Sequence, residues 1–157
     1  MDMEVILKTL GDLPQEEAGL RLRVVEEATS WIGTPYHTNG DIKGAGVDCG
    51  MLLIRVYADT GVIEPFDPRP YPAQWSFNQR TELYLQSILR FATEVESPLP
   101  ADVAVFKVGH CWGHGAIITS WPDIIHANPP SFCREDNCRM NLSLRKRTPR
   151  FFSRWAR

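Results

Sequence analysis

The sequence predicts an α+β fold in which N-terminal helices pack on an antiparallel β-sheet. Two segments before residue 60 repeat apolar residues at the spacing of one helix face. After Pro100, short runs rich in Val, Ile and Phe alternate with turn residues, as in strands joined by hairpins. Helices followed by a meander of strands are typical of the α+β class.

Length and composition indicate an ordinary globular protein. The chain has 157 residues, which favours one domain over residues 1–157. Hydrophobic residues make up 43% and charged residues 23% of the sequence, and the formal net charge is -2. We therefore expect no nucleic-acid partner. We also expect no transmembrane segment, because no stretch is long and apolar enough to cross a bilayer.

The N-terminal part is predicted to hold one long helix. Residues 1–14 carry early acidic residues and no apolar core of a secretory signal, so we interpret them as an N-terminal extension of a chain made in the cytoplasm. Gln15–Ile32 is predicted to be a helix, with Arg21 outside its apolar face. Gly33 and Pro35 are expected to end this helix.

A glycine-rich loop, a buried helix and a proline-rich loop are predicted next. Residues 39–46 hold three glycines and are expected to form a flexible loop. Asp48 is expected to cap a helix at Cys49–Ala58. Residues 63–75 hold four prolines and are expected to lack regular structure, and a third helix is expected at 81–95.

The rest of the chain is predicted to supply the sheet. Pro122 is expected to lie in the turn that joins the second and third strands as a hairpin. The four predicted strands are Val103–Val108, His114–Trp121, Ile124–Ala127 and Phe151–Trp155.

The C-terminal segment 139–157 is basic, because every formally charged residue from Arg139 onward is Arg or Lys. The ordinary interpretation is a solvated face. The alternative is a contact surface for an anionic polymer such as a cell wall.

Cys49 is the candidate nucleophile. It follows the glycine-rich loop and begins an apolar helix. Unpaired N–H groups and the positive end of the helix dipole at that position favour the thiolate over the thiol. The alternative is an inert buried cysteine that packs as a small hydrophobic residue.

His114 and His126 are the candidate partners of Cys49. They lie on the two strands of the predicted hairpin, where they can sit side by side on one face of the sheet. One imidazole would accept the thiol proton and the other would fix its orientation. His110, in the loop ahead of the strand, is an alternative base. His37 is expected to be an exposed loop residue, and the alternative is that it lines the site.

The cysteines leave one metal-site alternative open. Cys111, His114, Cys133 and Cys138 could supply four ligands to a structural zinc ion, but the spacing is unusual and would take His114 away from catalysis. Cys133 and Cys138 would form a disulfide only in an oxidising setting. The catalytic interpretation needs no metal and no other cofactor.

Five short motifs follow one another in chain order. They are WIGTPY at 31–36, GVDCG at 46–50, PADVAVF at 100–106, HGAII at 114–118 and IIHA at 124–127. This series resembles the NlpC family of papain-like cell-wall cysteine peptidases, over about Val24 to Ala127.

The resemblance implies a papain-like (NlpC-type) fold and a set of site residues. Cys49 would be the nucleophile, His114 the general base and then acid, and His126 the orienting third member. Tyr36 would point its hydroxyl into the site, and Asp48 would receive the free amine of the substrate. The implied substrates are peptidoglycan stem peptides, cut beside a γ-linked D-glutamyl residue.

Two positions differ from the usual family pattern, and both bear on substrate choice rather than on reaction type. Gly50 stands where a serine is common, and Gly115 stands where a valine is common. The expected lack of a signal peptide or wall-binding domain, and the segment Tyr71–Trp75 before a predicted helix, resemble members carried in phage tails and prophages. This implies a virion location and phage tail proteins as partners.

Two other functions remain open at this point. One is an amidase or acyltransferase of different specificity on the same fold. The other is a non-catalytic structural module of a phage tail.

Overall fold

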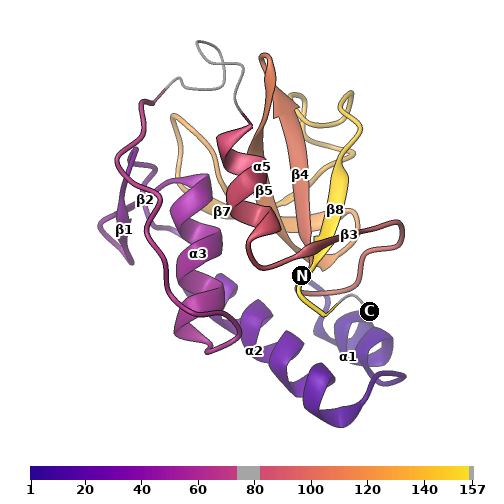
Figure 1. The fold of residues 1–157 in the computed structure, drawn as a ribbon. Helices are drawn as coiled ribbons and strands as arrows, with labels where there is room; N and C mark the ends of the chain where they lie inside the picture. The colour runs from indigo at the N-terminus through magenta and orange to yellow at the C-terminus, as the bar shows by residue number, and fades with distance from the viewer. Residues whose placement is uncertain (74–81, 156–157) are drawn as a thin grey trace.

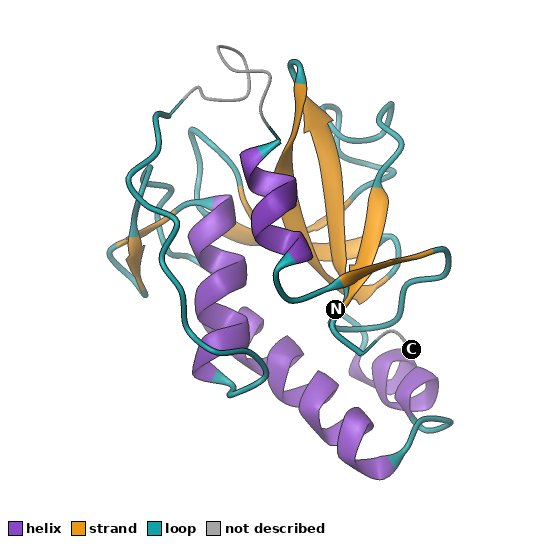
Figure 2. Cartoon of the chain, viewed as in Figure 1, coloured by secondary structure: helices purple, strands orange, loops and turns teal. Residues whose placement is uncertain are grey.

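A computed structural model describes residues 1–73 and 82–155, and within them a six-stranded sheet lies beside a group of helices (Figures 1 and 2). In chain order the elements are α1 (Met3–Leu10), α2 (Gln15–Ser30), β1 (Asp41–Ile42), β2 (Gly46–Val47), α3 (Cys49–Asp59), α5 (Leu83–Leu89), β3 (Thr93–Val95), β4 (Val103–Val108), β5 (Cys111–Ser120), β6 (Asp123–Ala127), β7 (Cys133–Asn137) and β8 (Arg150–Ser153). The strand order is β3-β8-β4-β5-β6-β7, with antiparallel neighbours. The predicted α+β class is confirmed.

Helix α1 corrects the interpretation of residues 1–14 as an extension. The Asp2 side chain caps it by accepting hydrogen bonds from two N–H groups of the first turn, at 3.1 and 3.3 Å. Ile6 and Leu10 lie one helical turn apart and are buried, and the helix contacts α2 and β5. A helix of two turns is stabilised by such tertiary burial rather than by its own periodicity, so the sequence pattern was too short to reveal it.

Helix α2 confirms the predicted long helix but corrects the position of Arg21. This side chain was expected outside the apolar face and is instead 2% exposed. Its guanidinium donates hydrogen bonds to the Asp102 carboxylate and to the Pro100 carbonyl, both at 2.8 Å. It also lies over the Trp155 ring, 4.3 Å from the centroid. The buried charge is accommodated because the opposite charge of Asp102, in the loop directly before β4, lies next to it.

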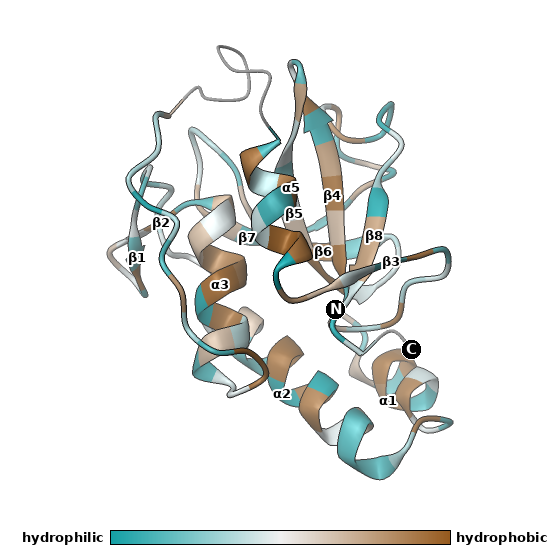
Figure 3. Ribbon diagram, in the orientation of Figure 1, coloured by the Kyte–Doolittle hydropathy of each residue, from teal (hydrophilic) through white to brown (hydrophobic). Residues whose placement is uncertain are grey.

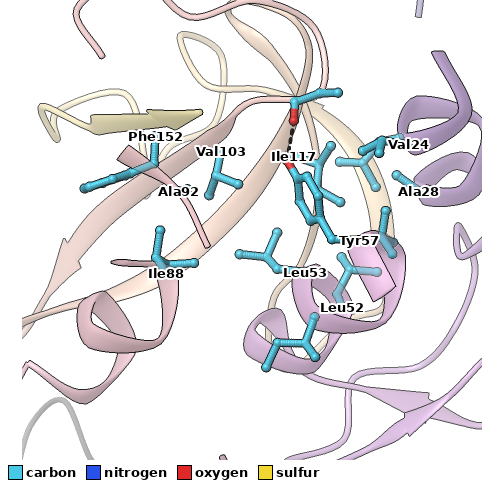
Figure 4. Close-up of a cluster of buried hydrophobic side chains, with 14 of the residues drawn as sticks. Val24, Ala28, Leu52, Leu53, Tyr57, Ile88, Ala92, Val103, Ile117 and Phe152 are labelled. Atoms are coloured by element: carbon cyan, nitrogen blue, oxygen red, sulfur yellow. Dashed lines mark hydrogen bonds between the residues drawn. The ribbon is translucent and has the colours of Figure 1, made fainter. Parts of the chain in front are cut away.

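Helix α3 forms the centre of the packing between helices and sheet. It contacts α2 on one side and strands β5 and β6 on another. Leu53 and Tyr57 point toward Val103 and Ile117 of the sheet, and the Tyr57 hydroxyl donates a hydrogen bond to the Ala101 carbonyl (Figure 4). All five residues are buried, which fixes α3 and therefore the first residue of that helix against the sheet.

The loop regions differ in part from expectation. Residues 39–46 were expected to form a flexible loop, but β1 and β2 pair as a short hairpin, with Asp41 opposite Val47. Described residues 63–73 contain no helix or strand, as predicted. The segment Tyr71–Trp75 lies outside the described residues beyond position 73.

The third predicted helix, at 81–95, is wrong at its C-terminal end. Helix α5 ends at Leu89, and Thr93–Val95 forms β3, which pairs with β8. The β-branched Thr93 and Val95 fit this short edge strand, where pairing with Phe151 outweighs the helical spacing. Position 81 lies outside the described residues.

The predicted strands are confirmed with small shifts in their ends. Strand β4 has the predicted bounds, β5 begins earlier at Cys111, β6 begins at Asp123, and β8 covers Arg150–Ser153. Strand β7 was missed. Its sequence is almost wholly polar because it is the edge of the sheet beside β6, and only Cys133 is buried.

Apolar residues follow the inner elements, with brown segments along α3 and β4 and hydrophilic colours in the turns (Figure 3). Within residues 1–73 and 82–155, no helix has the length and hydropathy needed to cross a membrane.

Candidate active site

Cys49 is the first residue of α3. Asp48 takes the N-cap position, where its carboxylate accepts a hydrogen bond from the Met51 N–H at 2.8 Å. Cys49 is half-buried, and its thiol donates to the Gly113 carbonyl on β5 at 3.8 Å. The thiol therefore lies next to the residue that precedes His114, although the two are far apart in the sequence.

His114 and His126 lie side by side on the adjacent strands β5 and β6. The distance from His114 Nε2 to His126 Nδ1 is 2.8 Å, and the rings meet edge to face. His114 is 6% exposed and His126 is fully buried. The structure thus places the two histidines as the hairpin prediction expected.

Asp136 on the missed strand β7 extends this pair. Its Oδ2 lies 3.3 Å from His126 Nε2, and it also accepts hydrogen bonds from the Asn141 side chain at 2.7 Å and from Arg134. Burial works to raise the pKa of Asp136, but the hydrogen bonds from Asn141 and the Asn137 N–H, together with His126, hold it below its usual value. An ionised Asp136 accepts the hydrogen on His126 Nε2.

The hydrogen-bond chain then fixes both imidazole tautomers. With a hydrogen on Nε2, neutral His126 can only accept through Nδ1, so the hydrogen between the rings belongs to His114 Nε2. His114 Nδ1 is left with a lone pair. This is the protonation state that a general base needs.

The pKa shifts of Cys49 and His114 both favour the uncharged form of the side chain. Burial, and secondly the Asp48 charge, raise the pKa of the Cys49 thiol to about 12. Burial, the neighbouring His126 and then Arg147 lower the pKa of His114 to about 3. Burial therefore opposes the effect of the helix dipole, which was expected to favour the thiolate of Cys49.

Cys49 and His114 both line a cavity of about 790 Å³. Tyr36 and Asp48, the two predicted substrate-binding residues, line the same cavity. His126 does not, because it lies behind His114. Burial is the main cause that raises the pKa of Tyr36 above its usual value, so its hydroxyl keeps its proton.

Tyr71 and Tyr84 also line the cavity, and the sequence analysis did not single out either as a site residue. The Tyr71 hydroxyl lies 2.9 and 2.8 Å from the two Asp48 carboxylate oxygens. The Tyr84 hydroxyl donates to the Cys49 carbonyl at 3.1 Å. Tyr71 opens the segment Tyr71–Trp75 and Tyr84 lies in a predicted helix, but neither pattern indicates a contact with Asp48 or Cys49, because both contacts join residues that are distant in the sequence.

The two tyrosines explain the two glycines that differ from the family pattern. A Cβ atom on Gly50 would lie 3.3 Å from the Tyr71 hydroxyl and 3.5 Å from the Tyr84 ring. A Cβ atom on Gly115 would lie only 2.2 Å from the Tyr84 hydroxyl. Gly115 therefore provides the space that the Tyr84 side chain occupies, and Gly50 avoids a close contact with the Tyr71 hydroxyl.

The alternative residues lie elsewhere. His110 and His37 are exposed and do not line the cavity. The four cysteines are free thiols, and Cys133 and Cys138 belong to different buried clusters. Within the described parts of the chain, no group of three or more His, Cys, Asp or Glu side chains is placed to hold a metal ion.

Solved structures with the same fold define its class. The NlpC/p60 domain of the peptidoglycan hydrolase SagA is similar, with a TM-score of 0.59 and 20% identity over 84% of this chain and 96% of that chain. NlpC1 from Trichomonas vaginalis has a TM-score of 0.62 and 14% identity, over 86% of this chain and 44% of that chain. An NlpC/p60 family protein from Bacillus cereus has a TM-score of 0.56 and 17% identity, over 83% of this chain and 39% of that chain.

This chain therefore has the NlpC/p60 papain-like fold. It spans less than half the length of the Trichomonas vaginalis and Bacillus cereus proteins. No family model matches the sequence, and no curated protein matches it either.

Proposed function

We propose that this protein is a cysteine peptidase that hydrolyses amide bonds in peptidoglycan stem peptides, beside a γ-linked D-glutamyl residue. One observation carries the proposal: Cys49 and His114 line the same cavity, and His114 is hydrogen-bonded to His126 behind it. A nucleophile, a base and an orienting residue are the parts that thiol-dependent acyl transfer needs. The fold shared with a peptidoglycan hydrolase domain supports the substrate class.

The proposed reaction is acyl transfer in two steps. His114 Nδ1 accepts the thiol proton as Cys49 Sγ attacks the scissile carbonyl carbon, and N–H groups at the start of α3 stabilise the oxyanion. His114 then donates the proton to the leaving nitrogen, the C–N bond breaks, and a thioester remains. Water gives a proton to His114 and attacks the thioester, which releases the acid product and restores the thiol.

We make three further proposals, which concern the substrate-binding residues, the extent of the domain and the branch of the family. Tyr36 and Asp48 act in the part of the cavity that takes the amino-terminal end of the substrate, Asp48 through the Tyr71 hydroxyl that it holds. Residues 1–157 form one catalytic domain. The protein belongs to the phage-tail and prophage branch, which detection of the chain in purified virions would test.

The test is mass spectrometry of peptidoglycan and of defined stem peptides after incubation with the protein. We expect new fragments from the wild type and none from Cys49→Ala. Cys138→Ala is the matched control, because Cys138 is buried in a separate cluster and its loss should leave the fragments unchanged.

The other outcomes separate the alternative functions. If neither protein yields fragments while Cys49 reacts with a thiol probe, another amide or ester is the substrate, as in an amidase or acyltransferase. If Cys49 does not react either, the fold serves as a structural module.

A further inference from the structure

Asp48 lies where the resemblance places the free amine of the substrate, but its carboxylate is already hydrogen-bonded. It is 2% exposed. Oδ1 accepts from the Met51 N–H at 2.8 Å and Oδ2 from the Asn39 N–H at 2.7 Å, and the Tyr71 hydroxyl lies within 2.9 Å of both oxygens. Because Asp48 is almost fully buried and the Tyr71 hydroxyl lies next to both of its oxygens, an incoming ammonium group would meet Tyr71 before it reached a carboxylate oxygen.

Tyr71 is held in this position by contacts on both its backbone and its side chain. The Asn39 amide pairs with the Tyr71 backbone, at 3.1 Å to its carbonyl and 3.3 Å from its N–H. Arg69 donates to the Asn39 carbonyl at 2.9 Å and forms an ion pair with Asp41. Two loops that are distant in the sequence are thereby joined next to Asp48.

The charge of Asp48 is also compensated without a substrate. The carboxylate caps α3, so it faces the positive end of the helix dipole as well as its hydrogen-bond donors. A substrate ammonium brought to this end would lose hydration and gain no direct ion pair.

We propose that the Tyr71 hydroxyl, rather than the Asp48 carboxylate, meets the amino-terminal end of the substrate, and that the site prefers stem peptides whose amino terminus is acylated. The inference rests on the proposed peptidase function. Because the hydroxyl donates its hydrogen to Asp48, its oxygen can still accept a hydrogen bond from a neutral amide N–H. Such an amide is present when the stem peptide is still joined to the glycan strand.

The experiment compares kcat/KM for one stem peptide in two forms, with a free amino terminus and with an acetylated one. We expect the wild type to prefer the acetylated form. Tyr71→Ala uncovers Asp48. The ratio of the two kcat/KM values should then move toward the free-amine peptide by about tenfold or more, which corresponds to about 1.4 kcal/mol. Tyr71→Phe, which removes the donor but keeps the ring, should move it in the same direction.

Tyr84→Phe is the matched control. It removes a tyrosine hydroxyl that lines the same cavity but binds the Cys49 carbonyl, so the ratio between the two peptides should stay at the wild-type value. Thermal unfolding of each variant checks that it is folded.

Equal or better hydrolysis of the free-amine peptide by the wild type would overturn the inference and leave the proposed peptidase intact. A ratio of the two kcat/KM values that neither Tyr71 variant changes would also overturn the inference. A wild type that cleaves neither form would reject the proposed function itself, and the inference with it.

Discussion

Asp136 controls the protonation of two other side chains. Its carboxylate accepts the hydrogen of His126 Nε2, which makes His126 an acceptor toward His114 and leaves His114 Nδ1 with its lone pair. Asp136 does not line the cavity, so in the proposed reaction it would act only by positioning the two imidazoles.

The variant Asp136→Asn tests this role. An amide can donate to His126 Nε2, which would reverse both tautomers and place a hydrogen on His114 Nδ1. We expect kcat to fall by about 100-fold or more while KM changes little, because a similar tautomer error in the serine-protease triad costs about 10⁴-fold. Steady-state kinetics on a defined stem peptide separates the two constants.

Arg134→Gln is the control for Asp136→Asn. Arg134 donates to the same carboxylate at 3.0 Å, so its loss disturbs the surroundings of Asp136 and leaves the acceptor of His126 in place. A kcat as low for Arg134→Gln as for Asp136→Asn, or a raised KM in both, would show that Asp136 is only structural.

Between elements, the site depends on how α3 meets the β5–β6 hairpin. Helix α3 contacts both strands, and Tyr57 ties its far end to the loop before β4. Cys49 is thereby held at one end of the helix, against Gly113 on β5. The ion pair between Arg21 and Asp102 connects α2 to the start of β4 in a similar way.

We expect Asp102→Asn to lower the free energy of unfolding by at least about 2 kcal/mol. Arg21 and Asp102 are 2% and 1% exposed, so the variant leaves a buried guanidinium with a weaker partner. Urea denaturation measures the change. Asp59→Asn removes one partner of the exposed Arg55–Asp59 pair and should cost about 0.5 kcal/mol or less. Equal losses in the two variants would contradict the structural role assigned to Arg21.

The elements that the sequence could predict are those that carry a periodic apolar pattern over many residues. Helices α2 and α3 and strands β4, β5 and β6 bury one or both faces, and their side chains show this directly. Helix α1 is too short for a clear period, and β7 is a polar edge strand. These two depend on tertiary contacts, which no local pattern encodes.

The same distinction applies to the candidate site. Cys49, His114 and His126 lie in motifs, and a hairpin is enough to bring the histidines together. Asp136 depends on the unpredicted strand β7, and Tyr71 on the pairing of two loops. Arg21 was misplaced because its partner Asp102 is 81 positions away.

For the folded protein as one unit, the buried histidines make stability depend on pH. Burial lowers the pKa of His114 to about 3 and, against the opposing effect of Asp136, also lowers the pKa of His126. Unfolding returns both to about 6.5. Below that pH the unfolded chain binds more protons than the native one. The contribution of the two histidines to the free energy of unfolding is therefore complete above about pH 6.5 and decreases as the pH falls toward 3.

We expect the free energy of unfolding to decrease between pH 6.5 and 4.5, by at most about 1.4 kcal/mol per pH unit for each histidine. Urea denaturation at a series of pH values gives this slope. His114→Gln removes one of the two groups and should reduce the slope. Carboxylates with lowered pKa values, such as Asp136, add their own loss of stability only as the pH approaches 4 and below.

A stability that stays constant from pH 7 to 5, or a slope that His114→Gln leaves unchanged, would mean that the histidine pair is hydrated and protonated in the native state. The neutral His114 that the proposed reaction requires would then be lost as well.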